Sequence, residues 1–220
     1  MPPRYAPPVF AAVALLLLTG TRCVFIATSG DRPPCRSTTD KHCDSKVTVS
    51  VGETIARGRL IDAPVEGVAY VSGSIAGVTA ADGSFEYESG GRVRFFIGDI
   101  ALGEPAAGKA HLSPLDLVRG GTLDTPAVIN IARLLQSLDA VPGDDGITIT
   151  AGVRAEATRS NAAVGASIVS LDFADDTAFV NAAAQLVSTL TADFPRTAVL
   201  VDAPTARAAL VQGLENAGIR

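Results

Sequence analysis

The spacing of apolar residues divides the chain into segments with different periodicities. Residues 47–110 contain short apolar runs, and within one of them Val93, Phe95 and Ile97 alternate with Arg92, Arg94 and Phe96. Alternation with period two is typical of antiparallel strands that bury one face. Turn residues separate the runs, and the Asp82-Gly83 pair between apolar runs is a hairpin signal. This pattern predicts a small antiparallel β-sandwich of roughly six or seven strands.

Residues 111–220 follow a helical period instead. Asp124-Thr125-Pro126 is a helix start, with an acceptor cap and a proline in the first turn. Apolar residues then recur every three or four positions as far as Leu138, which predicts an amphipathic helix. Two more helices are expected, one from about Asp175 to Pro195 and one beginning near Asp202 or Thr205. The pattern leaves two segments open: 147–150 fits a short strand or a connection, and 151–170 is rich in alanine. The fold class is therefore α+β, with a helical region packed on the sandwich.

Residues 1–29 have the pattern of an export signal. Val9 to Thr19 is an uncharged run of signal-peptide length, whereas a membrane span needs about 20 apolar residues. Three alternatives remain: cleavage after Ser29, a lipid on Cys23 as in lipoproteins, or an uncleaved signal anchor. Arg22 stands directly before Cys23, where a lipoprotein signal has a small residue. Each alternative predicts an exported protein of the periplasm, the cell envelope or the extracellular space.

A polar linker, residues 30–46, follows this signal and carries two further cysteines. Cys35 and Cys43 are eight positions apart, and two nearby cysteines on a polar loop pair in an oxidising compartment. We therefore expect a disulfide between them. The rival interpretation is a metal site of Cys35, His42 and Cys43, but three ligands with two of them adjacent suit a tetrahedral centre poorly.

Composition narrows the range of partners. The 220 residues include 18 basic and 23 acidic residues, for a formal charge of −5. This balance argues against a groove that neutralises phosphates and against a polybasic membrane-binding surface. We expect no nucleic-acid partner, no cofactor, and membrane contact only through the N-terminal segment or a lipid on Cys23.

The sequence contains none of the common sets of catalytic residues. His111, Ser113 and Asp116 are too close along the chain for the usual triad, and no nucleophile elbow, zinc-protease motif or phosphate-binding loop occurs. Carboxylates such as Asp62 and Asp172 are more readily turn or cap residues. We therefore predict no catalytic residue and no enzymatic activity.

The best candidate for an ion site is the acidic loop that follows the first predicted helix. Asp139, Asp144 and Asp145, with carbonyls near Gly143, could supply oxygens to calcium, although the alternating acidic spacing of calcium loops is absent. The expected alternative is a solvated acidic loop that holds no metal.

Six blocks in order carry a family resemblance over roughly residues 58–150: DAPVEGVAY, TAADGSFEYESGG, VRFFIGDIALGE, LSPLDLV, TPAVINIARLLQSLD and GDDGITIT. They resemble a group of uncharacterised bacterial envelope lipoproteins. The ADGSFEY element is also similar to transthyretin-like and carboxypeptidase-regulatory-like sandwiches, which are structural or binding modules. Some of the envelope proteins bear an automatic label as an organic-solvent transporter permease. That label does not fit, because no run of 18 apolar residues follows residue 30.

These observations predict an exported, non-enzymatic binding or structural protein, whose partner is an unidentified envelope protein or surface ligand. One alternative is a carrier of a small apolar ligand or lipid, with a cavity between the sandwich and the helices. A second alternative is a hydrolase with an unrecognised carboxylate site, for which Asp116 and Asp172 are the residues to mutate.

Overall fold

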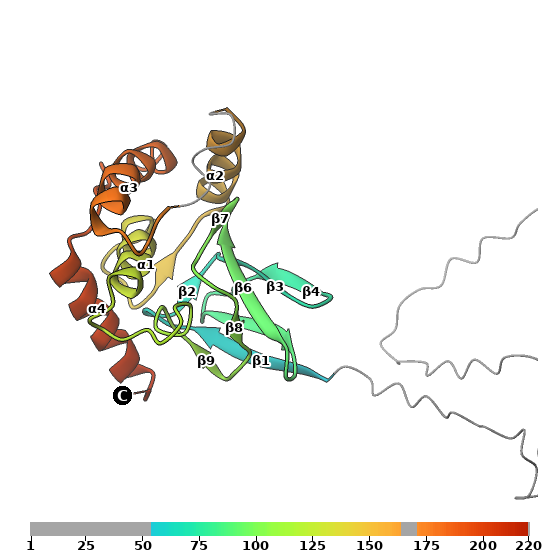
Figure 1. The fold of residues 1–220 in the computed structure, drawn as a ribbon. Coiled ribbons are helices and arrows are strands. Elements are labelled where there is room, and N and C mark those ends of the chain that lie inside the picture. Colours follow the sequence, from blue (N-terminus) through green and yellow to red (C-terminus); the bar gives the residue numbers. More distant parts are fainter. Residues whose placement is uncertain (1–53, 164–170, 220) are drawn as a thin grey trace, which may run out of the picture. The chain divides into compact units, whose positions relative to one another are not determined.

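The computed structural model describes residues 54–163 and 171–219 (Figure 1). Antiparallel sheets and four helices within these residues confirm the mixed α+β class. The strands are β1 Ile55–Leu60, β2 Val65–Glu66, β3 Ala69–Ser72, β4 Ile75–Val78, β5 Ser84–Glu88, β6 Arg92–Ile97, β7 Ile100–Ala101, β8 Ala106–Ala107, β9 His111–Leu112 and β10 Ile147–Thr148. The helices are α1 Pro126–Ser137, α2 Ala151–Ala163, α3 Asp176–Leu190 and α4 Ala203–Asn216.

The strands form three small sheets. Their orders are β5-β1-β9, β4-β3-β6-β7 with β8 paired to β6, and β10-β2. All pairs are antiparallel except β1–β9 and β2–β10. The predicted alternation in β6 is confirmed, because Val93, Phe95 and Ile97 are fully buried while Arg92 and Arg94 are exposed. Since β9 and β10 follow residue 110, the second half of the chain completes sheets that the first half begins.

The Asp82-Gly83 turn differs from the prediction. It joins β4 to β5, but these strands do not pair, and β5 pairs with β1 instead. The expected hairpin is therefore wrong, although the turn itself is real. Gly83 has φ +74°, and a Cβ there would lie 2.6 Å from the Leu60 carbonyl oxygen, so only glycine suits the position.

Side chains of β3 explain why β5 does not extend the β4 sheet. The Glu86 N–H donates to the Tyr70 hydroxyl at 3.2 Å, and the Glu88 N–H donates to Ser72 Oγ at the same distance. These amides of β5 are thus satisfied by side chains rather than by a neighbouring strand. Below them, the rings of Phe85 and Phe95 meet edge to face at 5.2 Å, so one core lies between the two sheets.

The helices begin close to the predicted positions. Asp175 and Asp202 cap α3 and α4, each accepting a backbone N–H of the first turn. At α1 the predicted acceptor cap is wrong, because Thr125 makes no capping bond to the helix and its Oγ1 accepts from the Thr122 N–H instead. Of the alanine-rich segment 151–170 that the sequence left open, residues 151–163 form α2, and residues 164–170 lie outside the described residues. No described helix is long and apolar enough to cross a membrane.

Helix α1 is buried on almost all sides rather than along one stripe. It contacts both α3 and α4 (Figure 1), and ten of its residues are buried. Its buried polar groups bind the connections around it: Asn130 donates to the Phe173 carbonyl, and Arg133 Nε donates to the Val201 carbonyl at 2.8 Å. The Arg133 guanidinium also lies over the Phe179 ring, with 5.3 Å from Cζ to the centroid. These contacts fix α3 and α4 around α1.

Candidate functional site

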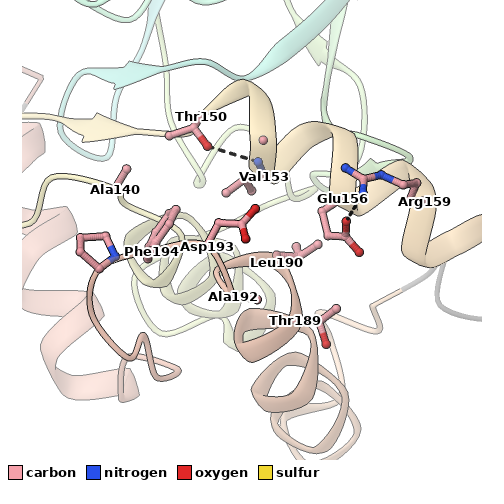
Figure 2. Close-up of a pocket in the computed structure, with 12 residues that line it drawn as sticks. Ala140, Thr150, Val153, Glu156, Arg159, Thr189, Leu190, Ala192, Asp193 and Phe194 are labelled. Carbon is pink, nitrogen blue, oxygen red and sulfur yellow. Dashed lines mark hydrogen bonds and ion pairs between the residues drawn. The ribbon is translucent and has the colours of Figure 1, made fainter.

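One hollow in the described residues lies between α2 and the end of α3 (Figure 2). Its volume is about 610 Å³, which is in the range of small-molecule sites. Three parts of the chain line it: the loop after α1, the first turns of α2, and the α3 C-terminus with the residues that follow. The lining residues are Ala140, Thr150, Gly152, Val153, Glu156, Arg159, Thr189, Leu190, Ala192, Asp193, Phe194 and Pro195.

The α2 wall of this pocket is organised by local hydrogen bonds. Thr150 precedes α2, and its Oγ1 accepts the Val153 N–H at 3.2 Å, which caps the helix. One turn further on, Glu156 and Arg159 form an ion pair of 3.1 Å (Figure 2). Gly152 contributes no side chain, and a Cβ built there would meet only Thr150 Oγ1, at 3.6 Å. The pocket is therefore open directly in front of the first turn of α2.

The opposite wall carries an acidic group beside an aromatic ring. Asp193 and Phe194 follow α3, and Figure 2 shows the Asp193 carboxylate directed toward the first turn of α2. Among the described residues, Asp193 makes no hydrogen bond or ion pair with another side chain. The free N–H groups of a helix N-terminus favour a nearby negative charge. A ligand in the pocket would thus meet an accepting carboxylate against an apolar wall of Leu190 and Val153.

Arg196 fixes the position of Phe194 in this wall. Its guanidinium donates to the Asp139 carbonyl oxygen and lies 5.7 Å from the centroid of the Phe194 ring. In the described part of the chain, Arg196 Nε is the buried side-chain nitrogen that lacks a hydrogen-bond partner. The contacts tie the end of the α3 segment to the α1–β10 loop and hold the aromatic ring in place.

A second hollow, of about 560 Å³, lies where the N-termini of α1, α3 and α4 approach one another. Its charged side chains are already engaged in ion pairs. Arg207 pairs with Asp124 at 2.8 Å, and Asp176 pairs with the buried Arg133 at 3.2 Å. Among the described residues, every charged group that lines this hollow is ion-paired, so the α2–α3 pocket is the stronger candidate.

The residues considered for calcium hold the α1–β10 loop. Asp139 Oδ1 accepts the N–H groups of Val141 and Thr148, at 3.1 and 2.9 Å, and Asp144 Oδ1 accepts the Gly146 N–H at 3.0 Å. Asp145 is exposed. Within the described ranges, no three histidine, cysteine or acidic side chains gather as a metal site would need.

Two of the three residues of the possible hydrolytic triad, Ser113 and Asp116, form a turn. Asp116 accepts both the N–H and the Oγ–H of Ser113, at 2.9 and 3.2 Å, and its other oxygen pairs with Lys109 at 2.7 Å. No hydrogen bond joins His111 to either group within the described chain. Asp172 likewise accepts the N–H groups of Ala174 and Asp175, which confirms its expected turn role. Cys23, Cys35 and Cys43 lie outside the described residues.

Sequence reasoning missed the environment of Asp62. It was expected as a turn residue, and it does follow β1, but its side chain is fully buried between that turn and helices α1 and α4. Both carboxylate oxygens accept from a single donor, Gln136 Nε2, at 3.1 Å. Burial raises the pKa of Asp62 from 3.8 to about 7, against the smaller lowering effect of the Gln136 hydrogen bond. Nothing in the local sequence marks this, because the burial comes from helices far along the chain, and the Gln136 donor is 74 residues away.

Asp193 was also missed, since it appeared only as part of the segment that ends the second predicted helix. Its signal, an acidic residue beside Phe-Pro after a helix, is too common to indicate a site. Comparison of the chain with family models, curated proteins and solved structures gives no match.

Proposed function

We propose that this chain is an exported, non-enzymatic binding protein of the cell envelope, and that the α2–α3 pocket holds its ligand. The uncharged run from Val9 to Thr19 supports export, and the linker that follows supports a tether to the envelope. The observation that carries the binding proposal is the pocket itself, with a small-molecule volume and one uncommitted carboxylate, that of Asp193.

The lining favours a small amphipathic ligand with an amine or another strong hydrogen-bond donor. Asp193 offers two acceptor oxygens, and Phe194 offers a ring face on which a cation or an apolar group packs. Val153 and Leu190 provide apolar contact. Glu156 and Arg159 add charge at the rim, which favours such a ligand over a bare acyl chain.

The same proposal includes a β-sandwich as the scaffold. The two larger sheets would be its layers, and the bonds from β5 amides to Tyr70 and Ser72 support their close approach. Helices α1 to α4 then extend the scaffold, and the pocket is supplied by α2, the end of α3 and the loops next to them. The ligand site would therefore lie within the helical region rather than between helices and sandwich.

A titration with a defined amine tests this proposal. We expect benzylamine, followed by two-dimensional NMR, to shift the amide signals of Val153, Asp193 and Phe194, whereas benzyl alcohol shifts them at a higher concentration. Asp193→Asn should weaken benzylamine binding about fivefold to tenfold, because a charge-assisted hydrogen bond is lost. Asp145→Asn, an exposed acid outside the pocket, is the matched control and should leave binding unchanged.

A blocking variant separates the pocket from the rest of the surface. Gly152→Phe places a ring in front of the α2 wall without a close Cβ contact, so the fold should persist while the shifts disappear. Shifts that survive in Gly152→Phe, or that map away from α2 and the α3 C-terminus, would contradict the proposal.

A further inference from the structure

The outward faces of the two larger sheets differ in polarity: one carries paired charges and the other is mainly apolar. On the β1–β5 pair, charged residues oppose one another across the strands, and Arg57 pairs with Glu86 at 3.0 Å. Arg59 likewise pairs with Asp82, in the turn before β5, at 2.9 Å. Such cross-strand pairs are typical of a sheet surface that faces water. Among the described residues, no ion pair lies on the outward face of the β4-β3-β6-β7 sheet.

We call this second surface the β3 face. It consists of the outward positions of four neighbouring strands: Ala76 and Val78 on β4, Ala69 and Val71 on β3, Arg92, Arg94 and Phe96 on β6, and Ala101 on β7. The register puts them in rows, with Val78, Ala69, Phe96 and Ala101 across one row. Val71 and Val78 are 44% and 48% exposed. Ala76 is also exposed, whereas Ala69, Phe96 and Ala101 are half-buried, so the apolar part of the face is exposed mainly over β3 and β4.

Charge on the β3 face has one sign. None of its strands contains an acidic residue, although acids outnumber bases in the whole chain. Arg94 lies beside Val71 and is exposed, and it has no ion-pair partner among the described residues. Arg92 lies two positions before it and donates only to the carbonyl of Pro105. A partner that covers the apolar rows would thus meet two cations that have no acidic partner in the described part of the chain.

The dimensions of the face suit one helix. Three strands spaced about 4.8 Å apart span about 10 Å, close to the diameter of an α-helix with its side chains. Ala69 and Ala76 leave room for close approach, and the larger Val71, Val78 and Phe96 would contact the apolar stripe of such a helix. A sheet face that is apolar is normally covered by a helix or a second sheet.

We propose that the β3 face docks an amphipathic helix of a partner protein, with acidic residues along the flank that meets Arg92 and Arg94. Its apolar stripe packs on Val71, Val78 and Phe96. An added strand at the β4 edge would leave both arginines without acidic partners, so the charges favour a helix across the face. This surface is separate from the α2–α3 pocket, and the inference does not depend on the ligand proposed there.

Two designed peptides test the proposal with the full-length chain. Both have leucines at helical spacing on one face, and they differ in carrying glutamates or lysines on the flanks. We expect the glutamate peptide to bind in fluorescence anisotropy, and Arg94→Glu to weaken it about tenfold. Val71→Asp should weaken it at least as much. Arg57→Glu, on the face with cross-strand pairs, is the matched control and should change binding less than twofold.

Charge exchange makes the test specific. Arg94→Glu should bind the lysine peptide more tightly than the wild type does, a gain that a merely unfolded variant cannot show. The proposal is overturned if the glutamate peptide binds more weakly than about 1 mM, or if Arg94→Glu leaves its affinity unchanged. Binding to vesicles of phosphatidylglycerol that Val71→Asp abolishes, without peptide binding, would assign the face to lipid instead. Self-association that Val71→Asp abolishes, again without peptide binding, would assign it to a second copy.

Discussion

Replacing the buried carboxyl of Asp62 by an amide should stabilise the protein at neutral and alkaline pH. Asp62 is fully buried, with Gln136 Nε2 as its hydrogen-bond donor and no basic group within ion-pair distance among the described residues. The helices packed against it direct their charges elsewhere: Arg133 binds Asp176, and Arg207 binds Asp124. An ionised Asp62 is therefore buried without a counter-charge, which is costly.

The magnitude and its pH window follow from the pKa. Burial raises the pKa of Asp62 from 3.8, the value expected in the unfolded chain, to about 7. The folded protein thus retains a proton that the unfolded chain releases, and stability falls as pH rises from about 4 to about 7. A rise of this size corresponds to at most about 4 kcal/mol of lost stability above pH 7. Asp62→Asn removes this dependence, because the amide does not titrate.

Urea unfolding at several pH values measures the effect. We expect Asp62→Asn to differ little from the wild type at pH 4 and to be more stable by about 2–4 kcal/mol at pH 8. Asp145→Asn, at an exposed position, should match the wild type at every pH. A stability difference between Asp62→Asn and the wild type that is flat from pH 4 to pH 8 would refute the reasoning. So would an Asp62→Asn protein that is less stable at pH 8.

Two further predictions use matched pairs. Gly213→Ala should destabilise the fold by about 2 kcal/mol or more in thermal unfolding, because the new Cβ would lie 1.8 Å from the Asp62 carbonyl oxygen. Gly152→Ala should instead stabilise the fold by about 0.5 kcal/mol, because alanine favours the helix and its Cβ has space there. Equal effects of the two substitutions would contradict the packing of α4. Tyr70→Phe should cost about 1–2 kcal/mol in urea unfolding, since it leaves a β5 amide without its acceptor, while Tyr87→Phe should cost less than about 0.5 kcal/mol. A Tyr70→Phe protein as stable as Tyr87→Phe would show that water replaces the hydroxyl.

Local signals in the sequence predicted much of the fold. The alternation of apolar and polar residues predicted β6 and its buried face, and Asp175 and Asp202 predicted where the helices that they cap begin. These features depend on residues within a few positions of one another. The partners of the strands did not follow in the same way: the turn at Asp82-Gly83 is local, but whether β5 pairs with β4 or with β1 depends on Tyr70 and Ser72 from another strand.

The candidate site was less predictable, for the same physical reason. Asp193 and Gly152 are unremarkable in their own segments, and the pocket arises only where α2 approaches the end of α3. Asp62 likewise becomes unusual only because α1 and α4 cover it. Asp139 and Asp144 were chosen for their carboxylates, yet those oxygens are engaged by amides of their own loop. Motifs reveal chemistry carried by neighbours in sequence, and here the candidate chemistry comes from distant elements.

The most direct test of the binding proposal is native mass spectrometry of the full-length protein, purified gently from the envelope fraction of its own cells. The account predicts that wild-type protein retains a small molecule carrying an amine or another strong hydrogen-bond donor, and that Gly152→Phe, recovered from the same fraction, lacks it. Wild-type protein that is free of any bound molecule, or a molecule retained equally by Gly152→Phe, would contradict the assignment of the α2–α3 pocket as the ligand site.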